Sequence, residues 1–348
     1  MRYCKSLTTT ILFCLLLYKG FTGAQLETEK PQVRIIATGG TIANSPDGRM
    51  AVQTVLEQIP SIGDVADITI RDYVRIGSSE ISLQNWIDIA NLITDELADH
   101  PDTDGVVVTH GSNTSEETAY FLNLVLNTQV PVVIAAAQRE RTTLSEDGSR
   151  NLFDAVRVAA HPGARGHGVL MVVNEMIHAA RDVTKTISYR PETWDSGDLG
   201  ALGLADSDRI RFYRTPTSRH TFNSDLHLDS ITQAGSLPRV DIVYTYADAG
   251  PELVEAAVAA GAEGIVVAGF ATGTPTPAIG TALEDAEALG VAIVMSHRGG
   301  RGRVETGRPF VSADNLTPKR LGFCLCSRLR AGCRSTHSKV SLRAIEDQ

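Results

Sequence analysis

Short, nearly continuous apolar runs alternate with longer segments of helical periodicity through most of the sequence. The runs at residues 33–37, 105–109 and 131–137 have the composition of strands that are buried on both faces of a parallel sheet. At residues 83–97 the apolar side chains recur three and four positions apart, which predicts a helix that covers one face of the sheet. The alternation predicts an α/β fold, with a parallel sheet and helices on both faces.

The same periodicities predict the remaining elements of a larger N-terminal part, residues 25–215. A capping box of Thr114 and Glu117 is expected to begin one of its helices. The further strands and helices expected here are strands at 68–76 and 168–173 and helices at 52–59, 114–127 and 151–160.

A second, smaller α/β part is expected at residues 239–318. Residues 216–238 are polar and rich in turn residues, which indicates a linker before it. The elements expected in the smaller part are strands at 240–244, 264–268 and 291–295 and helices at 253–260 and 277–289.

The first 24 residues have the features of a secretory signal peptide. Arg2 and Lys5 precede an apolar run at residues 11–18, and small residues follow at 22–24. A secreted or periplasmic protein is therefore expected. An uncleaved membrane anchor is the alternative, although the apolar run is short for a bilayer span.

Charge and cysteine content argue against several classes of function. The formal net charge is −9, and a net acidic protein is a poor nucleic-acid binder. Cys4 and Cys14 lie in the signal segment, and the odd set Cys324, Cys326 and Cys333 matches neither a disulfide framework nor a zinc pattern. No G-x-G-x-x-G motif is present, so neither a metal nor a dinucleotide cofactor is expected.

The last thirty residues, 319–348, differ from the rest of the chain. They hold seven Lys or Arg residues against two acidic ones, three cysteines, and little helical periodicity. Two explanations stay open, a reading-frame shift in the coding sequence and a genuine basic tail that binds a surface.

Two of the predicted strands end in turns rich in glycine and hydroxyl groups. Thr41 follows Gly39 and Gly40 after the first strand, and Ser112 follows Gly111 after the strand at 105–109. Ligands bind at the carboxyl edge of open α/β sheets. A threonine hydroxyl becomes an effective nucleophile only when a base removes its proton, so these turns together with a lysine predict a hydrolytic site.

Three motifs carry a family resemblance. ATGGTIA at residues 37–43, VVTHGSNTSEETAYFLN at 107–123 and RDVTKT at 181–186 resemble, in the same order, the signatures of bacterial-type, exported (type II) L-asparaginases. The resemblance covers residues 33–318 and implies a two-domain α/β enzyme. The reaction it implies is hydrolysis of L-asparagine to L-aspartate and ammonia without a cofactor. It also implies a homotetramer of intimate dimers that share their sites.

The resemblance assigns roles to individual residues. Thr41 corresponds to the nucleophile, while Ser112, Asn113 and Lys185 correspond to a threonine, an aspartate and a lysine that act together on the attacking hydroxyl or water. The substrate contacts that it assigns are Ser78 and Ser79 for the α-carboxylate and Ala137 for the leaving amide.

The chain departs from the family's pattern at several positions. Asn113 lacks the negative charge that holds the substrate's α-ammonium, and residues 43–54 contain no tyrosine to complete the group around Thr41. Residues 269–274 replace an asparagine-bearing turn, and Glu305 is a weak candidate for the glutamate that a partner subunit lends. Three functions therefore stay open, namely an asparaginase, a glutaminase or related short-amide hydrolase, and a non-catalytic amino-acid-binding descendant.

Overall fold

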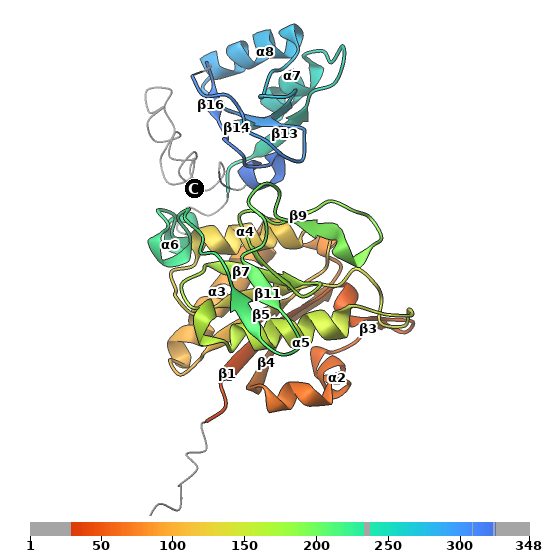
Figure 1. Ribbon diagram of the computed structural model, residues 1–348. Helices are drawn as coiled ribbons and strands as arrows, with labels where there is room; N and C mark the ends of the chain where they lie inside the picture. The colour runs from red at the N-terminus through yellow and green to blue at the C-terminus, as the bar shows by residue number, and fades with distance from the viewer. Residues whose placement is uncertain (1–28, 233–236, 308, 323, 325–348) are drawn as a thin grey trace, which may run out of the picture. The chain divides into compact units, whose positions relative to one another are not determined.

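The structure is a computed structural model that describes residues 29–232, 237–307, 309–322 and 324 (Figure 1). The described residues from Pro31 onward belong to one compact unit. The predicted signal peptide and most of the predicted tail lie outside the described residues. No helix in the described part of the chain is long and apolar enough to cross a membrane.

The larger sheet has eight strands in the order β12-β11-β8-β7-β6-β5-β1-β4 (Figure 1). Five neighbouring strands, β4, β1, β5, β6 and β7, are parallel, as predicted. The bounds of the eight strands are β1 Gln32–Gly39, β4 Asp67–Ile76, β5 Gly105–Thr109, β6 Val132–Ala135, β7 Val169–Val173, β8 Met176–Ala179, β11 Gly203–Ala205 and β12 Ile210–Phe212.

The remaining pairings of this sheet are antiparallel, and they form an edge that the sequence analysis did not include. Strand β7 turns directly into β8 through Asn174 and Glu175, whose φ angles are 50° and 62°. A two-residue turn with both φ angles positive is the type I′ turn that joins antiparallel strands. Glutamate is uncommon at turn positions with a positive φ, so the sequence did not predict this hairpin.

Helices cover both faces of this sheet, in agreement with the prediction. Val108 of β5 faces a core cluster with Trp86 and Phe121, whose rings stack 5.7 Å apart. The neighbouring Val107 faces a second cluster with Leu152 on the other side. The helices of this part are α2 Val52–Glu57, α3 Leu83–Asp99, α4 Ser115–Val125, α5 Gly148–Ala159 and α6 Leu228–Thr232.

Helix α4 begins differently from the prediction. The Thr114 side chain makes no cap hydrogen bond to the helix, so the predicted capping box with Glu117 was wrong. Its hydroxyl instead donates to the carbonyl oxygen of Ser78, 2.8 Å away. A tertiary hydrogen bond thus replaces the local one and ties the start of α4 to the turn after β4.

The smaller sheet is wholly parallel, with the order β13-β14-β15-β16. Its strands and helices are β13 Val240–Tyr244, β14 Gly264–Gly269, β15 Ala292–His297, β16 Val311–Ser312, α7 Glu252–Ala259 and α8 Pro277–Ala288. Three of these strands and both helices were predicted. Strand β16 has only two residues and no apolar run, so no sequence pattern indicated it.

Short elements connect the longer ones. They are the strand pairs β2 Asn44–Ser45 with β3 Gly48–Arg49 and β9 Thr184–Lys185 with β10 Trp194–Asp195, and the 3-10 turns η1 Thr41–Ala43, η2 Pro60–Asp64, η3 Ser78–Glu80, η4 Pro162–Ala164, η5 Pro191–Thr193 and η6 Thr221–Asn223. The segment predicted as a linker thus contains η6 and α6.

The chain does not change character immediately after Pro318. Residues 318–322 are helical, and both Leu321 and Cys324 are fully buried in the core cluster of α3 and α4. The first residues of the predicted tail are therefore part of the packed structure.

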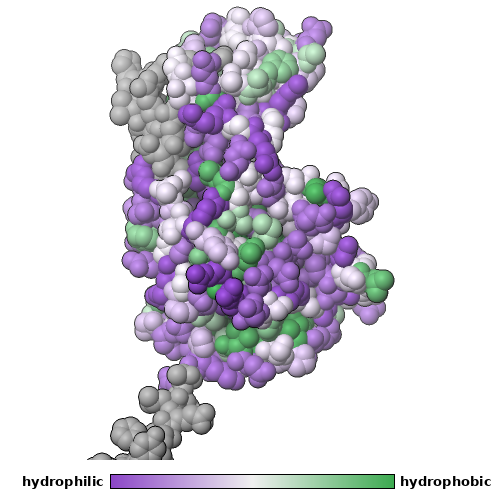
Figure 2. Space-filling view, in the orientation of Figure 1, coloured by the Kyte–Doolittle hydropathy of each residue, from purple (hydrophilic) through white to green (hydrophobic). Residues whose placement is uncertain are grey.

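The surface is mainly hydrophilic on the face that Figure 2 shows, where hydrophobic residues form separate small patches. The exposed large apolar side chains of the described residues include Leu144, Tyr189 and Leu289. Scattered exposed apolar residues are normal on folded proteins and by themselves indicate no binding surface.

Candidate functional site

The two hydroxyl-bearing turns meet at glycine backbone. Gly40 has a φ of 80°, and its amide donates to the carbonyl oxygen of Ile76, 3.1 Å away. A Cβ atom on Gly40 would lie 2.3 Å from the amide nitrogen of Gly111. Only glycine permits both the dihedral angle and this approach. The turn that carries Thr41 thus lies directly against the turn that carries Ser112.

Ser78 joins a third turn to this site. Its side chain is buried, and its hydroxyl oxygen accepts a hydrogen bond of 3.1 Å from the amide of Asn113. A Cβ atom on Gly111 would lie 2.6 Å from the same hydroxyl oxygen. Because a hydroxyl can accept and donate at once, the Ser78 proton stays available for another acceptor.

Lys185 reaches the second turn from a different segment. It ends strand β9, where it pairs with Trp194, and its Nζ lies 5.9 Å from the centre of the Trp194 ring. Nζ is 2.7 Å from the Oγ of Ser112, which is almost fully buried. Burial lowers the pKa of Lys185, and the negative charges of Glu116 and Asp147 oppose this shift. A lysine whose pKa is lowered beside a buried hydroxyl can accept a proton from it.

The turn before Ser112 is fixed from inside the protein by His110. The ring is fully buried, with Nδ1 2.8 Å from the carbonyl oxygen of Gly111 and Nε2 2.8 Å from the hydroxyl of Thr118. The indole N–H of Trp86 donates to Thr118, so the Thr118 proton points to Nε2 and the His110 proton sits on Nδ1. Burial lowers the pKa of His110 to about 4, which keeps the ring neutral.

Ala137 is fully buried in the loop after β6, beside the start of α5. A Cβ atom on Gly148 would lie 3.1 Å from the Ile42 side chain and 3.3 Å from that of Ala137. This contact places the Thr41 turn, the Ala137 loop and helix α5 together.

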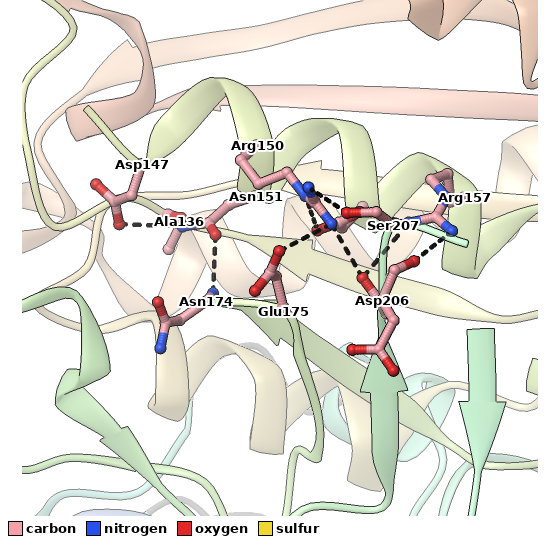
Figure 3. Close-up of polar contacts among 11 residues, drawn as sticks. Ala136, Asp147, Arg150, Asn151, Arg157, Asn174, Glu175, Asp206 and Ser207 are labelled. Atoms are coloured by element: carbon pink, nitrogen blue, oxygen red, sulfur yellow. Dashed lines mark hydrogen bonds and ion pairs between the residues drawn. The ribbon is translucent and has the colours of Figure 1, made fainter. Parts of the chain in front are cut away.

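Asp147 holds the Ala137 loop in shape, a role that the sequence did not reveal. Its carboxylate accepts from the amide of Gln138 at 3.0 and 3.1 Å and from that of Arg139 at 2.8 Å. Asn151 donates to the same carboxylate at 3.1 Å and to the carbonyl oxygen of Ala136 at 2.9 Å (Figure 3). Asp147 was overlooked because α5 was expected to begin at Asn151, which left Asp147 in a polar loop.

Helix α5 is in turn fastened to the antiparallel edge of the sheet (Figure 3). The side-chain Oδ1 of Asn151 accepts a hydrogen bond of 2.8 Å from the backbone amide of Asn174. Arg150 lies 3.0 Å from Glu175 and 2.6 Å from the buried Asp154. The hairpin missed from the sequence thus supports the helix that shapes the Ala137 loop.

Other candidate residues are less constrained. The Thr41 side chain is partly exposed, and no hydrogen bond joins its hydroxyl to another described residue. Ser79 and Asn113 are exposed. Glu305 is also exposed, and its amide donates to Thr272 in the turn after β14 at 3.1 Å.

No group of three or more His, Cys, Asp or Glu side chains among the described residues is arranged to hold a metal ion. The site described above offers hydroxyls, one lysine and buried backbone amides. These groups suit nucleophilic attack on a carbonyl carbon.

Two family models match the chain. The model described as "Asparaginase, N-terminal" matches residues 32–218, and that described as "Glutaminase/Asparaginase C-terminal domain" matches residues 239–333. Together they cover both sheets. The second match extends beyond Pro318, into the segment that was expected to be atypical.

Individual proteins agree with the family models. "L-asparaginase 2" of Bacillus subtilis is 38% identical over 308 residues, covering 86% of this chain and 81% of that protein. "Probable L-asparaginase periplasmic" of Haemophilus influenzae is 35% identical over 328 residues, covering 90% and 92%. A crystal structure titled "Probable Cytoplasmic L-asparaginase from Campylobacter jejuni" is 33% identical, with a TM-score of 0.84 over 91% of this chain and 99% of that one. The chain therefore belongs to the asparaginase family of amide hydrolases.

Proposed function

We propose that this protein hydrolyses the side-chain amide of L-asparagine to give L-aspartate and ammonia, with Thr41 as the nucleophile. The observation that carries the proposal is the 2.7 Å contact between the Lys185 Nζ and the Ser112 Oγ, in a place where burial lowers the pKa of Lys185. Membership of the asparaginase family supports the substrate class.

The proposed reaction begins when neutral Lys185 takes a proton, through Ser112, from the attacking hydroxyl. The Thr41 oxygen then bonds to the amide carbon, Lys185 returns the proton to the amide nitrogen, and the C–N bond breaks, so that ammonia leaves and an ester of Thr41 remains. Water attacks the resulting ester in the same way and releases L-aspartate. Direct attack by water, with Thr41 only holding the substrate, is the alternative route to the same products.

Substrate binding is proposed to use residues of the same turns and of the loop after β6. Ser78 and Ser79 would hold the α-carboxylate, and Ala137 lies in the loop proposed to face the leaving amide. Asn113 would accept one hydrogen bond from the α-ammonium through its amide oxygen. A neutral acceptor in place of a carboxylate weakens that contact by on the order of 1 kcal/mol.

Export, assembly and domain boundaries are also proposals. The leader-like residues 1–24 support a secreted or periplasmic protein, and the Haemophilus influenzae relative is named as periplasmic, whereas the Campylobacter jejuni structure is titled cytoplasmic. We further propose a homotetramer. The proposed domain boundaries are 25–215 and 239–318.

A non-catalytic amino-acid-binding protein is the second candidate. Two observations favour it. The Thr41 hydroxyl has no hydrogen-bond partner among the described residues, and the hairpin of β2 and β3 contains no tyrosine, so no described side chain activates Thr41 directly. Hydrolysis of L-glutamine is the nearer variant of the first proposal, since the matching C-terminal family model includes glutaminases.

Ammonia release from L-asparagine and from L-glutamine, by purified protein that lacks residues 1–24, separates these functions. We expect release from L-asparagine, its loss in Thr41→Ala, and its retention in Thr281→Ala, which removes an exposed threonine hydroxyl on α8. Binding of L-asparagine by folded protein without ammonia release would instead establish the non-catalytic function.

A further inference from the structure

A buried group of charges lies beside the candidate site and takes part in none of the steps above. Glu116, in the first turn of α4, is only 1% exposed, and Arg320 is 2% exposed. The Arg320 Nη2 lies 3.7 Å from one Glu116 carboxylate oxygen, and Lys319 pairs with the other. Charged side chains are seldom fully buried unless a specific arrangement requires them.

Arg320 also holds the strand that carries Lys185. Its Nη2 donates to the carbonyl oxygen of Val183 and, at 2.9 Å, to the hydroxyl of Thr184. Thr184 and Lys185 together form strand β9. The guanidinium therefore binds the strand immediately before the lysine through both its backbone and its side chain.

The same ion pair connects the two segments that must meet in the site. Glu116 follows Ser112 closely in the chain, and Arg320 fixes the residues just before Lys185. The pair thus links the helix after Ser112 to the strand that ends at Lys185. These segments carry the two atoms that lie 2.7 Å apart, the Ser112 Oγ and the Lys185 Nζ.

Stability alone does not account for burying this pair. Removing two charges from water costs free energy that their attraction often fails to recover, and apolar residues of the same volume commonly serve as well. A buried arginine offers something that an apolar residue lacks, namely several hydrogen bonds in fixed directions.

Resting on the proposed function, we propose that Arg320 is a positioning residue for Lys185: anchored by Glu116, it holds β9 so that the lysine Nζ lies against the Ser112 hydroxyl. Glu116 has a second effect on the lysine. The charged groups that act on Lys185 are Glu116 from α4 and Asp147 at the start of α5. The negative charges of Glu116 and Asp147 raise the pKa of Lys185 against the lowering by burial.

The test compares Arg320→Met, Arg320→Lys and Thr184→Val with Arg239→Met as the matched control. Arg239 is an exposed arginine of the smaller sheet that pairs with Asp241. Two quantities are measured in folded protein, the kcat and KM for ammonia release and the pKa of Lys185. The pKa comes from an NMR titration of protein whose lysines carry 13C-methyl groups, a tractable spectrum because the sequence has only six lysines.

Loss of positioning gives a defined pattern. In Arg320→Met we expect kcat to fall roughly 10- to 100-fold while KM changes little, since small displacements of a catalytic group have effects of this size. The lysine becomes more hydrated, so its pKa moves back toward the ordinary value of 10.5. Arg320→Lys should recover part of kcat, because an ammonium can donate to the same two oxygens. Arg239→Met should match the wild type.

If Arg320 serves only the stability of the fold, Arg320→Met will lower the unfolding temperature but leave kcat and the Lys185 pKa of the folded protein at wild-type values. That result would overturn the proposal. If Arg320→Met does not fold, Thr184→Val and Arg320→Lys decide in its place, since wild-type kcat and pKa in both would equally contradict it. Absence of ammonia release by the wild type would refute the proposed function, and the pKa measurement would still test the positioning.

Discussion

Lys185 and Thr41 lie in opposite surroundings within one candidate site. The Lys185 side chain is hydrogen-bonded to Ser112 and packs near Trp194. The residue before it, Thr184, is hydrogen-bonded to the buried Arg320. Thr41 is partly exposed, and no hydrogen bond joins its hydroxyl to another described residue. The proposed proton-accepting side is thus assembled within a single chain, whereas the side chain of Thr41, the proposed nucleophile, is left to be oriented by substrate or by another segment.

The contrast also shows how the two sides are joined. They share no hydrogen bond between described side chains, and the contact that brings them together is backbone against backbone at Gly40 and Gly111. The position of the Thr41 turn therefore depends on the absence of a Cβ atom at Gly40, while the position of Lys185 depends on hydrogen bonds. The two sides should respond differently to substitution.

The largest effect is expected when this glycine contact is broken. In Gly40→Ala the new Cβ would lie 2.3 Å from the Gly111 amide, and the φ of 80° adds strain. With a ψ of −176°, this conformation is essentially restricted to glycine, and such backbone strain costs about 1–3 kcal/mol. Overpacking costs about 1–3 kcal/mol more. Urea unfolding should show this loss, accompanied by a loss of ammonia release.

Gly261→Ala is the matched control for that variant. Gly261 has a nearly identical φ of 81°, but nothing lies within 4 Å of the Cβ position. It should therefore lose only the strain component and keep full activity. Equal losses of stability in the two variants would show that the turns do not press on each other.

A smaller effect is expected at Asn113, which is exposed at the edge of the lysine side. Asn113→Asp should supply the charge that a substrate ammonium prefers and lower the KM for L-asparagine about fivefold, corresponding to about 1 kcal/mol. The measurement is steady-state ammonia release, with Asn91→Asp, an exposed position on α3, as the control for net charge. An unchanged or raised KM would remove Asn113 from the binding site.

The sequence predicted the elements whose pattern is local. The strands at 33–37 and 105–109 were recognisable because both faces are buried over most of their length, so every position except Arg34 is apolar or small. The β7–β8 hairpin was missed because Glu175, its second turn residue, has no local preference for a positive φ, and β16 because two residues show no periodicity.

Site residues followed the same division. Thr41, Ser112 and Lys185 were proposed from motifs, whereas the contact between Ser112 and Lys185 spans 73 positions and no spacing rule gives it. Glu116 and Arg320, which the positioning proposal adds, were not singled out because each stands beside a residue of like charge, which usually indicates a solvated surface. Only the tertiary structure, which buries them against each other, shows their connection to the lysine.

Ammonia release by Lys185→Met tests most directly the claim that the Ser112–Lys185 pair is the proton acceptor of this site. Methionine keeps the unbranched stem and the apolar contacts of the lysine but lacks the terminal nitrogen and cannot take a proton. The account predicts that kcat falls on the order of 10²- to 10⁴-fold in folded protein, while Lys30→Met, an exposed substitution, leaves it unchanged. A Lys185→Met protein that retains the wild-type kcat would contradict the account.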